Sequence, residues 1–485
     1  MRKTLLILCI SFVFCLYPVF TARPQPSARS GELDRLEQNL GPNLDRLLKT
    51  KLYQNVRVGL AVADLASKRI VYQHRADVPL MTASALKIIP AGAALAQWGP
   101  DYCWSTPVYT DGFLKDRTLH GNLYLVGRGD PSLQISDLQK AAVDLKALGI
   151  DRINGDLIYD ISFFDEEPNR FAPNARDLYA PPCALSVNAN ALAIVIDEDL
   201  PQPKLDLFPQ TAYARLEYQV RLKKSVEPGR PLMTYAELPW GDQFTVKGTI
   251  TDWDKKYHYL RLGVSRPGLF SAVLFKEALT DAHIECRGQI RQGLLPGRAR
   301  ELVRLTSAPL KDSVKTMNRE SSNLIAEMLN KNLGAELVSV PGTRAKGLAV
   351  IKSFCTEKIH IPAVELFLED ACGLAPQNRL SALNFVKTLN YFYNTPEIKE
   401  SLLASLKEQI RPLRNRASAV RVLSKSGTLS ATGVNTEVGY LIDEQTGRVF
   451  SFAVLANRTR PGSMTYSGTL TEPILSAILE VFEDD

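Results

Sequence analysis

Apolar residues recur at helical spacing near the start of the chain, at Leu33, Leu36, Leu40, Leu44, Leu47 and Leu48. This spacing predicts an amphipathic helix over residues 33–53, interrupted near Gly41-Pro42. Alternating apolar residues then predict two strands, Val56–Leu65 and Arg69–Gln73, joined by a short polar turn. The alanine-rich run Ile88–Trp98 predicts a buried helix that bends at Pro90, because proline cannot donate a backbone hydrogen bond.

The stretch from about residue 100 to residue 307 has a different pattern, with many short alternating runs. The candidate strands are Thr118–Val126, Asp156–Asp160, Leu192–Ile196, Ala214–Leu222, Phe244–Ile250, Tyr259–Val264 and Gln289–Gln292. Two helical patterns, at 136–148 and 268–283, interrupt them. We therefore expect one or two β-rich domains here.

Helical periodicity returns after residue 308, and it predicts helices at roughly 310–333, 342–356, 380–393 and 396–406. An antiparallel meander and a closing helix are expected next, at Arg421–Ser424, Val434–Ile442, Arg448–Leu455 and Leu470–Glu483. The expected fold class is therefore α+β and multi-domain. Residues 32–99 and 308–485 would form one discontinuous domain of helices and antiparallel sheet, interrupted by the β-rich inserted domain or domains at 100–307.

The first 22 residues have the pattern of a secretory signal. Arg2 and Lys3 precede a charge-free run from Leu5 to Phe20, which is somewhat short for a membrane span. We interpret residues 1–22 as a signal peptide that directs the protein across the inner membrane, to the periplasm or the extracytoplasmic face. The alternative is an uncleaved anchor, which would hold the protein at the membrane surface.

Composition and charge exclude several classes of protein. The 485 residues are 45% hydrophobic and 23% charged, as in ordinary soluble globular proteins. The net charge of +6 comes from dispersed residues, so we expect no nucleic-acid partner. The five cysteines beyond the signal are widely spaced, which allows at most two disulfides and resembles no zinc site. The five histidines form no metal-binding motif, and we expect no metal and no cofactor.

Ser84 and Lys87 form the one Ser-x-x-Lys of the chain. At i and i+3 of a helix start the two side chains share one face, and the apolar neighbours would lower the pKa of the lysine by keeping water away. A lysine that is partly unprotonated can accept the proton of the serine. The alternative is an ordinary helix N-cap serine followed by a surface lysine.

Two further motifs follow in the chain. Ser321 and Asn323 form a Ser-x-Asn between two helical segments, and Lys425-Ser426-Gly427-Thr428 follows an apolar strand. Serine enzymes of the penicillin-recognising class use Ser-x-x-Lys, Ser-x-Asn and Lys-Thr/Ser-Gly in this order. A second Ser-x-Asn, Ser186–Asn188, is expected to be a structural turn. Glu166–Asn169 is expected to be a surface loop.

The order of the motifs, and the long gap between the first two, resemble the penicillin-binding protein 4 group of D-alanyl-D-alanine carboxypeptidases, peptidase family S13. Leu125–Pro131 looks like the Gly-Asp-Pro turn of that group, and Gly155–Asp160 looks like its Gly-Asp strand. Asp370–Leu374 with Asn378–Ser381 resembles its Asp-x-Ser-Gly-Leu-Ser-Arg-x-Asn-Arg segment. The resemblance runs from about residue 35 to residue 480 and implies a transpeptidase/β-lactamase-like catalytic domain.

The resemblance implies a role for each motif. The catalytic residues would be Ser84 as nucleophile, Lys87 as base and Ser321 as proton relay, and the substrate-binding residues would be Asn323, Lys425, Ser426, Gly427 and Thr428. The implied activity is that of a DD-carboxypeptidase and DD-endopeptidase. Its partners would be peptidoglycan stem peptides and β-lactam antibiotics. The alternatives are a β-lactamase or esterase on the same scaffold, or a silent envelope-binding protein, and the oligomeric state is left open.

This sequence departs from the family pattern at three places. Ser426 replaces the usual threonine, and Cys372 stands where the family has serine. Ala375-Pro376 stand where the family has Ser-Arg. The last two changes bear on how the side chain of the acyl donor is recognised.

Overall fold

The computed structural model describes residues 26–166, 181–197, 204–229, 231–256, 260–412, 419–460 and 470–481. The expected signal segment, residues 1–22, lies outside these ranges. Within them, no helix combines the length and the apolar character that a membrane crossing requires.

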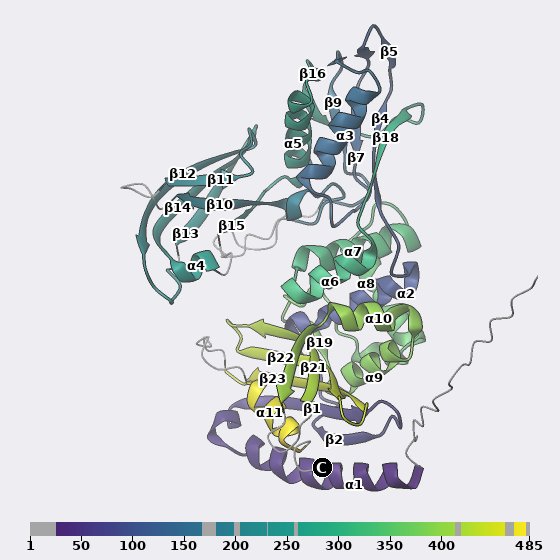
Figure 1. Ribbon diagram of the computed structural model, residues 1–485, viewed down its shortest axis with the longest axis vertical. Helices are drawn as coiled ribbons and strands as arrows, with labels where there is room; N and C mark the ends of the chain where they lie inside the picture. The colour runs from purple at the N-terminus through teal and green to yellow at the C-terminus, as the bar shows by residue number, and fades with distance from the viewer. Residues whose placement is uncertain are drawn as a thin grey trace, which may run out of the picture.

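A six-stranded antiparallel sheet draws strands from both ends of the chain (Figure 1). In spatial order its strands are β2 (Ile70–His74), β1 (Val56–Asp64), β23 (Val449–Arg458), β22 (Val434–Asp443), β21 (Ala419–Leu429) and β20 (Lys407–Pro412). The predicted hairpin and meander are thereby confirmed. The edge strand β20 was not predicted.

The sheet is buried on both faces. Along β1, Val58, Leu60 and Val62 enter one apolar core, whereas Ala61 and Ala63 enter another. This alternation follows from the two-residue repeat of a strand. The first core is covered by α1 (Pro26–Leu48) and α11 (Glu472–Val481), and the second by the helices that carry the site.

The predicted interruption of the first helix is wrong, because α1 continues through Pro42. Proline inside a helix costs about 3 kcal/mol. Four leucines of α1, Leu33, Leu36, Leu40 and Leu44, are at most 5% exposed. Burying each such side chain contributes about 1.5–3 kcal/mol, which outweighs the cost of the proline.

A layer of helices covers the inner face of the sheet. Its members are η2 (Ala83–Lys87), α2 (Ile88–Trp98), α6 (Leu310–Glu320), α7 (Asn323–Leu337), α8 (Arg344–Glu357), α9 (Ala382–Tyr393) and α10 (Pro396–Ser405), with the short pair β3 (Leu80–Met81) and β19 (Arg379–Leu380) beside them. Pro90 lies in the first turn of α2, where it is tolerated. The single helix expected at 310–333 is two helices, because the chain turns at Ser321.

The region from 105 to 306 builds four further sheets and forms the upper part of Figure 1. Two of them use β4 (Ser105–Thr110), β5 (Phe113–Lys115), β6 (Thr118–His120), β7 (Leu123–Val126), β8 (Arg152–Ile153), β9 (Leu157–Asp160), β16 (Glu285–Cys286), β17 (Ile290–Gln292) and β18 (Arg300–Thr306), with α3 (Ile135–Ala147) and α5 (Pro267–Asp281) packed against them. The other two use β10 (Ala191–Asp197), β11 (Lys204–Phe208), β12 (Ala214–Lys223), β13 (Leu232–Leu238), β14 (Gly241–Thr251) and β15 (Arg261–Gly263), with the short helix α4 (Asp252–Lys256) between β14 and β15.

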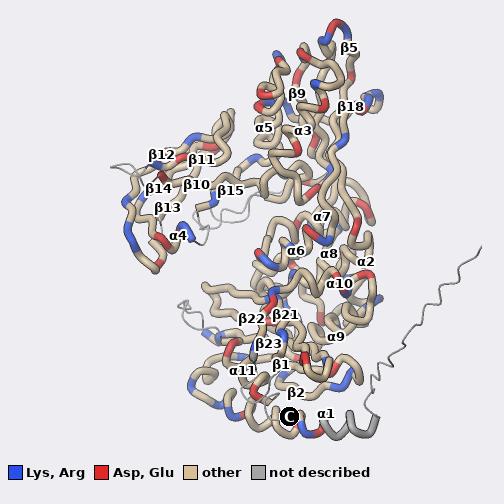
Figure 2. The backbone as a smooth tube through the Cα atoms, in the orientation of Figure 1, with Lys and Arg blue, Asp and Glu red and all other residues tan. Residues whose placement is uncertain are grey.

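The strand expected at Thr118–Val126 is two strands, because the chain turns at Gly121 with φ +150°. Basic and acidic residues are intermingled along the described part of the chain (Figure 2).

Gly92 allows α2 to approach α9 closely. A Cβ atom at this position would lie 2.1 Å from Cζ of Phe392. We expect Gly92→Ala to lower the free energy of unfolding by about 1–3 kcal/mol, the usual cost of overpacking a core. Chemical denaturation measures the change.

Ala96→Leu on the exposed face of the same helix is the matched control. It should change stability by less than about 0.5 kcal/mol. If Gly92→Ala were as stable as the control, the close contact between the two helices would be contradicted.

Candidate active site

Ser84 and Lys87 lie on one face of the 3₁₀ helix η2, where residues three apart are aligned. Nζ of Lys87 lies 2.9 Å from Oγ of Ser84. Lys87 is fully buried, whereas Ser84 is partly exposed. The alternative of a surface lysine is therefore wrong. Ala83, just before the serine, has φ +44°, a strained backbone that presents the hydroxyl at the start of the turn.

Burial lowers the pKa of Lys87 from the ordinary value of lysine. Cys372, Asp370 and Glu327 lie close enough to oppose this shift through their charges. Besides Ser84, the amine donates to Oδ1 of Asn323 at 2.6 Å and to the backbone carbonyl of Cys372 at 2.6 Å. Three oxygen atoms thus surround an amine that is buried from solvent.

The junction between α6 and α7 carries the Ser-x-Asn motif. Ser321 ends α6 in the left-handed conformation, with φ 58° and ψ 37°. Ser322 caps α7 by accepting a hydrogen bond from the backbone N–H of Ile325, and Asn323 opens α7 against Lys87. The structure therefore joins Asn323 to the Ser84–Lys87 pair. No hydrogen bond joins the Ser321 side chain to that pair in the part of the chain that is described.

The third motif lies on β21, next to η2. A Cβ atom on Gly427 would lie 2.6 Å from the backbone nitrogen of Ser84, so only glycine permits this approach. Ser426 and Thr428 are exposed. Lys425 is 3% exposed and donates to the carbonyl of Ser426 at 2.7 Å.

Lys425 is electrostatically unusual. Burial, followed by repulsion from Lys87 and Lys407, lowers its pKa from 10.5 to about 7. Lys407 is the first residue of the edge strand β20 and pairs with Ser424. It was not predicted as part of the site, because nothing in its polar surroundings marks a strand.

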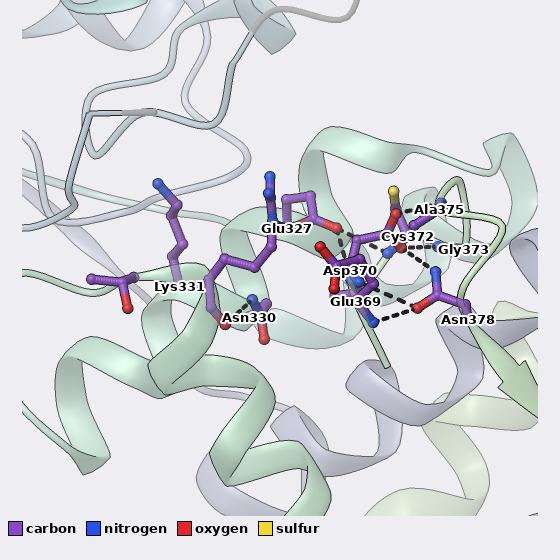
Figure 3. Close-up of polar contacts among 12 residues, drawn as sticks. Glu327, Asn330, Lys331, Glu369, Asp370, Cys372, Gly373, Ala375 and Asn378 are labelled. Carbon is purple, nitrogen blue, oxygen red and sulfur yellow. Dashed lines mark hydrogen bonds and ion pairs between the residues drawn. The ribbon is translucent and has the colours of Figure 1, made fainter. Parts of the chain in front are cut away.

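A loop after residue 369 contacts Lys87 through the carbonyl of Cys372, and Figure 3 shows the polar contacts within this loop. Asp370 accepts hydrogen bonds from the backbone N–H groups of Gly373 and Ala375, both at 2.6 Å, and from the side chain of Asn378 at 2.7 Å. Gly373 has φ +85°, and a Cβ atom there would lie 1.9 Å from the carbonyl oxygen of Ala83. The loop is thus packed directly against the backbone that carries the serine.

Glu327 of α7 reaches the same loop and was not singled out from the sequence. It accepts hydrogen bonds from the backbone N–H groups of Ala371 at 2.8 Å and Cys372 at 3.0 Å. Its other oxygen faces Arg344 at 3.2 Å. One signal could have found it, because Glu327 follows Asn323 by one helical turn and shares its face.

One group of side chains in the described ranges could be considered for a metal ion. Ligand atoms of Glu327, Asp370 and Cys372 all lie within 4.8 Å of one another. The carboxylate oxygens already accept N–H groups of the loop. Burial raises the pKa of the Cys372 thiol well above its ordinary value, which disfavours the thiolate that a metal would need. We therefore assign these residues to holding the loop.

The remaining sequence candidates lie away from this site. Ser186 is buried and donates to the carbonyl of Cys183 at 2.8 Å, in line with the expected structural turn. Glu166 is exposed and accepts a hydrogen bond from Gln292, while residues 167–169 lie outside the described ranges. The five cysteines considered for disulfides, Cys103, Cys183, Cys286, Cys355 and Cys372, are free.

The chain matches known proteins over most of its length. Residues 40–466 match the model of the D-Ala-D-Ala carboxypeptidase 3 (S13) family. A D-alanyl-D-alanine carboxypeptidase of Actinomadura sp. (strain R39) is 26% identical over 458 residues, which cover 88% of this chain and 82% of that protein. The D-alanyl-D-alanine carboxypeptidase DacB of Haemophilus influenzae is 24% identical over 354 residues, covering 71% and 72%.

A solved structure shows the same fold. The crystal structure of penicillin binding protein 4 (dacB) from Haemophilus influenzae superposes with a TM-score of 0.74 at 22% identity, over 91% of this chain and 98% of that one. The complex of that protein with a β-lactam gives a TM-score of 0.70. The α+β, penicillin-recognising fold expected from the sequence is thereby confirmed.

Proposed function

This chain belongs to the D-Ala-D-Ala carboxypeptidase 3 (S13) family of serine peptidases, and from this premise we propose that Ser84 is its nucleophile and Lys87 its general base. The observation that carries the proposal is the fully buried amine of Lys87, 2.9 Å from the Ser84 hydroxyl. An unprotonated amine at this distance can accept the hydroxyl proton as the oxygen attacks.

The substrate class is the D-Ala-D-Ala terminus of peptidoglycan stem peptides. Oγ of Ser84 attacks the carbonyl between the two D-alanines, and the backbone N–H groups of Ser84 and Thr428 stabilise the oxyanion. The approach of Gly427 to the Ser84 nitrogen supports this pairing. The C–N bond then breaks, and the departing amine takes a proton that Ser321 relays from Lys87. An acyl-enzyme remains on Ser84.

The substrate-binding residues surround this centre. Oδ1 of Asn323 is engaged by Lys87, so its Nδ2 is left to donate to the acyl carbonyl. Lys425 supplies positive charge for the terminal carboxylate, and the exposed hydroxyls of Ser426 and Thr428 donate to it. Water then attacks the acyl-enzyme and frees Ser84. The same steps on a cross-link between two stem peptides give DD-endopeptidase activity.

A β-lactam would acylate Ser84 in the same way, because its strained amide occupies the place of the scissile bond. The β-lactam complex of the related penicillin binding protein 4 supports this assignment. The chemistry uses no cofactor.

The proposed location and domain plan follow from family and fold. Family membership supports a location at the bacterial cell wall, and we propose that residues 1–22 export the enzyme to the periplasm or the extracytoplasmic face. We assign the catalytic domain to residues 32–99 and 308–485, and the inserted part to 100–307. The antiparallel pairing of Ser105 with Thr306 supports these boundaries, because the inserted part leaves and returns at one place.

Replacing the nucleophile tests the central assignment. We expect Ser84→Ala to abolish covalent labelling by penicillin, since it removes the attacking oxygen. Mass spectrometry of the intact protein measures the label, with Ser186→Ala, in the structural turn, as the matched control that stays labelled. A labelled Ser84→Ala protein would refute the assignment, and a label lost within seconds would indicate a β-lactamase instead.

The pKa of Lys425 predicts a pH dependence of substrate binding. Only the protonated lysine attracts the carboxylate, and its pKa of about 7 means that the charge is lost as the pH rises through neutrality. We expect KM for a D-Ala-D-Ala peptide to rise above about pH 7, approaching roughly tenfold per pH unit. A matched peptide ending in D-alaninamide, used as a competitor, should bind weakly and without this dependence. Equal pH profiles for the two peptides would contradict the role of Lys425.

The departures at Cys372 and Pro376 predict weak selection of the acyl donor. Cys372 is 1% exposed, and Pro376 offers no guanidinium for a bidentate pair with a donor carboxylate. We expect kcat/KM to differ by less than roughly tenfold, about 1.4 kcal/mol, between donors with and without that carboxylate. A larger preference would show that another cation serves, and Arg379→Ala would then test the nearest candidate.

A further inference from the structure

The buried carboxylate of Glu327 is connected to the reacting pair through a single residue. Glu327 accepts the backbone N–H of Cys372 at 3.0 Å, and the carbonyl of the same Cys372 accepts a hydrogen bond from Nζ of Lys87 at 2.6 Å. Cys372 is therefore held at both of its backbone polar groups. Figure 3 shows Glu327 at the edge of this loop.

Glu327 is a carboxylate that the fold keeps out of water at considerable cost. It is 5% exposed, and an unpaired buried charge would destabilise the protein strongly. Its oxygens accept hydrogen bonds from two backbone N–H groups and from the guanidinium of Arg344. Burial, followed by the charge of Asp370, raises the pKa of Glu327, and the three donors oppose this rise by stabilising the ionised form. A side chain that only filled space would not need three donors.

We propose that Glu327 is a positioning residue for acylation, which fixes the Ala371–Cys372 backbone so that the Cys372 carbonyl holds the Lys87 amine at Ser84. The inference rests on the proposed function. Asn323, one turn earlier on α7, touches the same amine directly. Asn323 and Glu327 lie on the same face of α7 and both position the Lys87 amine. Asn323 contacts the amine directly, and Glu327 acts through the backbone of Cys372.

Glu327 also acts on Lys87 through its charge. The charged and titratable groups around Lys87 are Lys425 from β21, Glu327 from α7, and Asp370 and Cys372 from the loop. Glu327 raises the pKa of Lys87 against the lowering by burial. Without the negative charge, the amine would lose its proton at lower pH and be a weaker base.

The test compares acylation by penicillin in wild type and Glu327→Gln across a range of pH. The amide oxygen can still accept the two backbone N–H groups, whereas the charge is gone. We expect the acylation rate at its plateau to fall by about 10- to 100-fold, because the amine without this charge beside it is a weaker base for the serine proton. The acidic limb of the profile should move to lower pH. A residue with only a structural role would leave that limb in place.

Glu336→Gln is the matched control, because it makes the same change on the same helix at an exposed carboxylate that binds Trp98 and Tyr102. It should leave both the rate and the limb unchanged. A folded Glu327→Gln protein with the wild-type rate and an unmoved limb would overturn the proposal.

Glu327→Asp decides the matter if Glu327→Gln fails to fold. The shorter side chain keeps the charge but withdraws the carboxylate, so we expect slower acylation with the limb close to its wild-type position. Acylation at the wild-type rate would overturn the proposal. Its failure is distinguishable from failure of the proposed function, because in the latter case wild type itself would acquire no penicillin at Ser84.

Discussion

The site depends on one constraint, which is that the amine of Lys87 must be kept from water without being left unpaired. Desolvation would suit the lysine to the role of base that we propose for it, but an isolated ammonium in an apolar core would cost far more than the fold could supply. The structure meets both demands with oxygen atoms from three different segments: Ser84 Oγ, Asn323 Oδ1 and the Cys372 carbonyl. None of these oxygens carries a full charge, so the amine is held without being fixed in its protonated form.

The same constraint explains why distant parts of the chain converge here. Gly373 and Gly427 bring two backbones against η2 from opposite sides, at distances that a side chain would forbid. Thr436 on β22 donates to the carbonyl of Thr82 at 2.8 Å and ties the start of η2 to the sheet. The backbone that carries Ser84 is therefore held by two close glycine contacts and by one side-chain hydrogen bond from the sheet.

The sequence predicts most of the helices and the meander, because each has a local periodicity, whereas the roles of the three motifs stay predictions. Prediction from local sequence patterns fails where tertiary packing overrides the local preference of the chain. Pro42 does not interrupt α1, since the buried leucines outweigh its cost. The strand β20 escapes prediction because Lys407, Glu408 and Gln409 are polar and Ile410 is itself exposed, so no apolar face marks the strand. The contact of Cys372 with Lys87 is made by a backbone carbonyl, which exists at every residue and so leaves no mark in a sequence.

The pairing of β1 with β23 bears on how the chain acquires its structure. Val56 lies opposite Arg458, so the hairpin of β1 and β2 finds its other partner, β23, only after almost the whole chain is available. Contacts between residues so far apart are slow to form, and unpaired apolar strands are prone to aggregate meanwhile. The pairing of Ser105 with Thr306 reduces the entropy cost of this long-range contact. Once the region between these two residues has folded, it brings the two flanking parts of the chain together. From this topology we expect the central region of the chain to fold before its two ends.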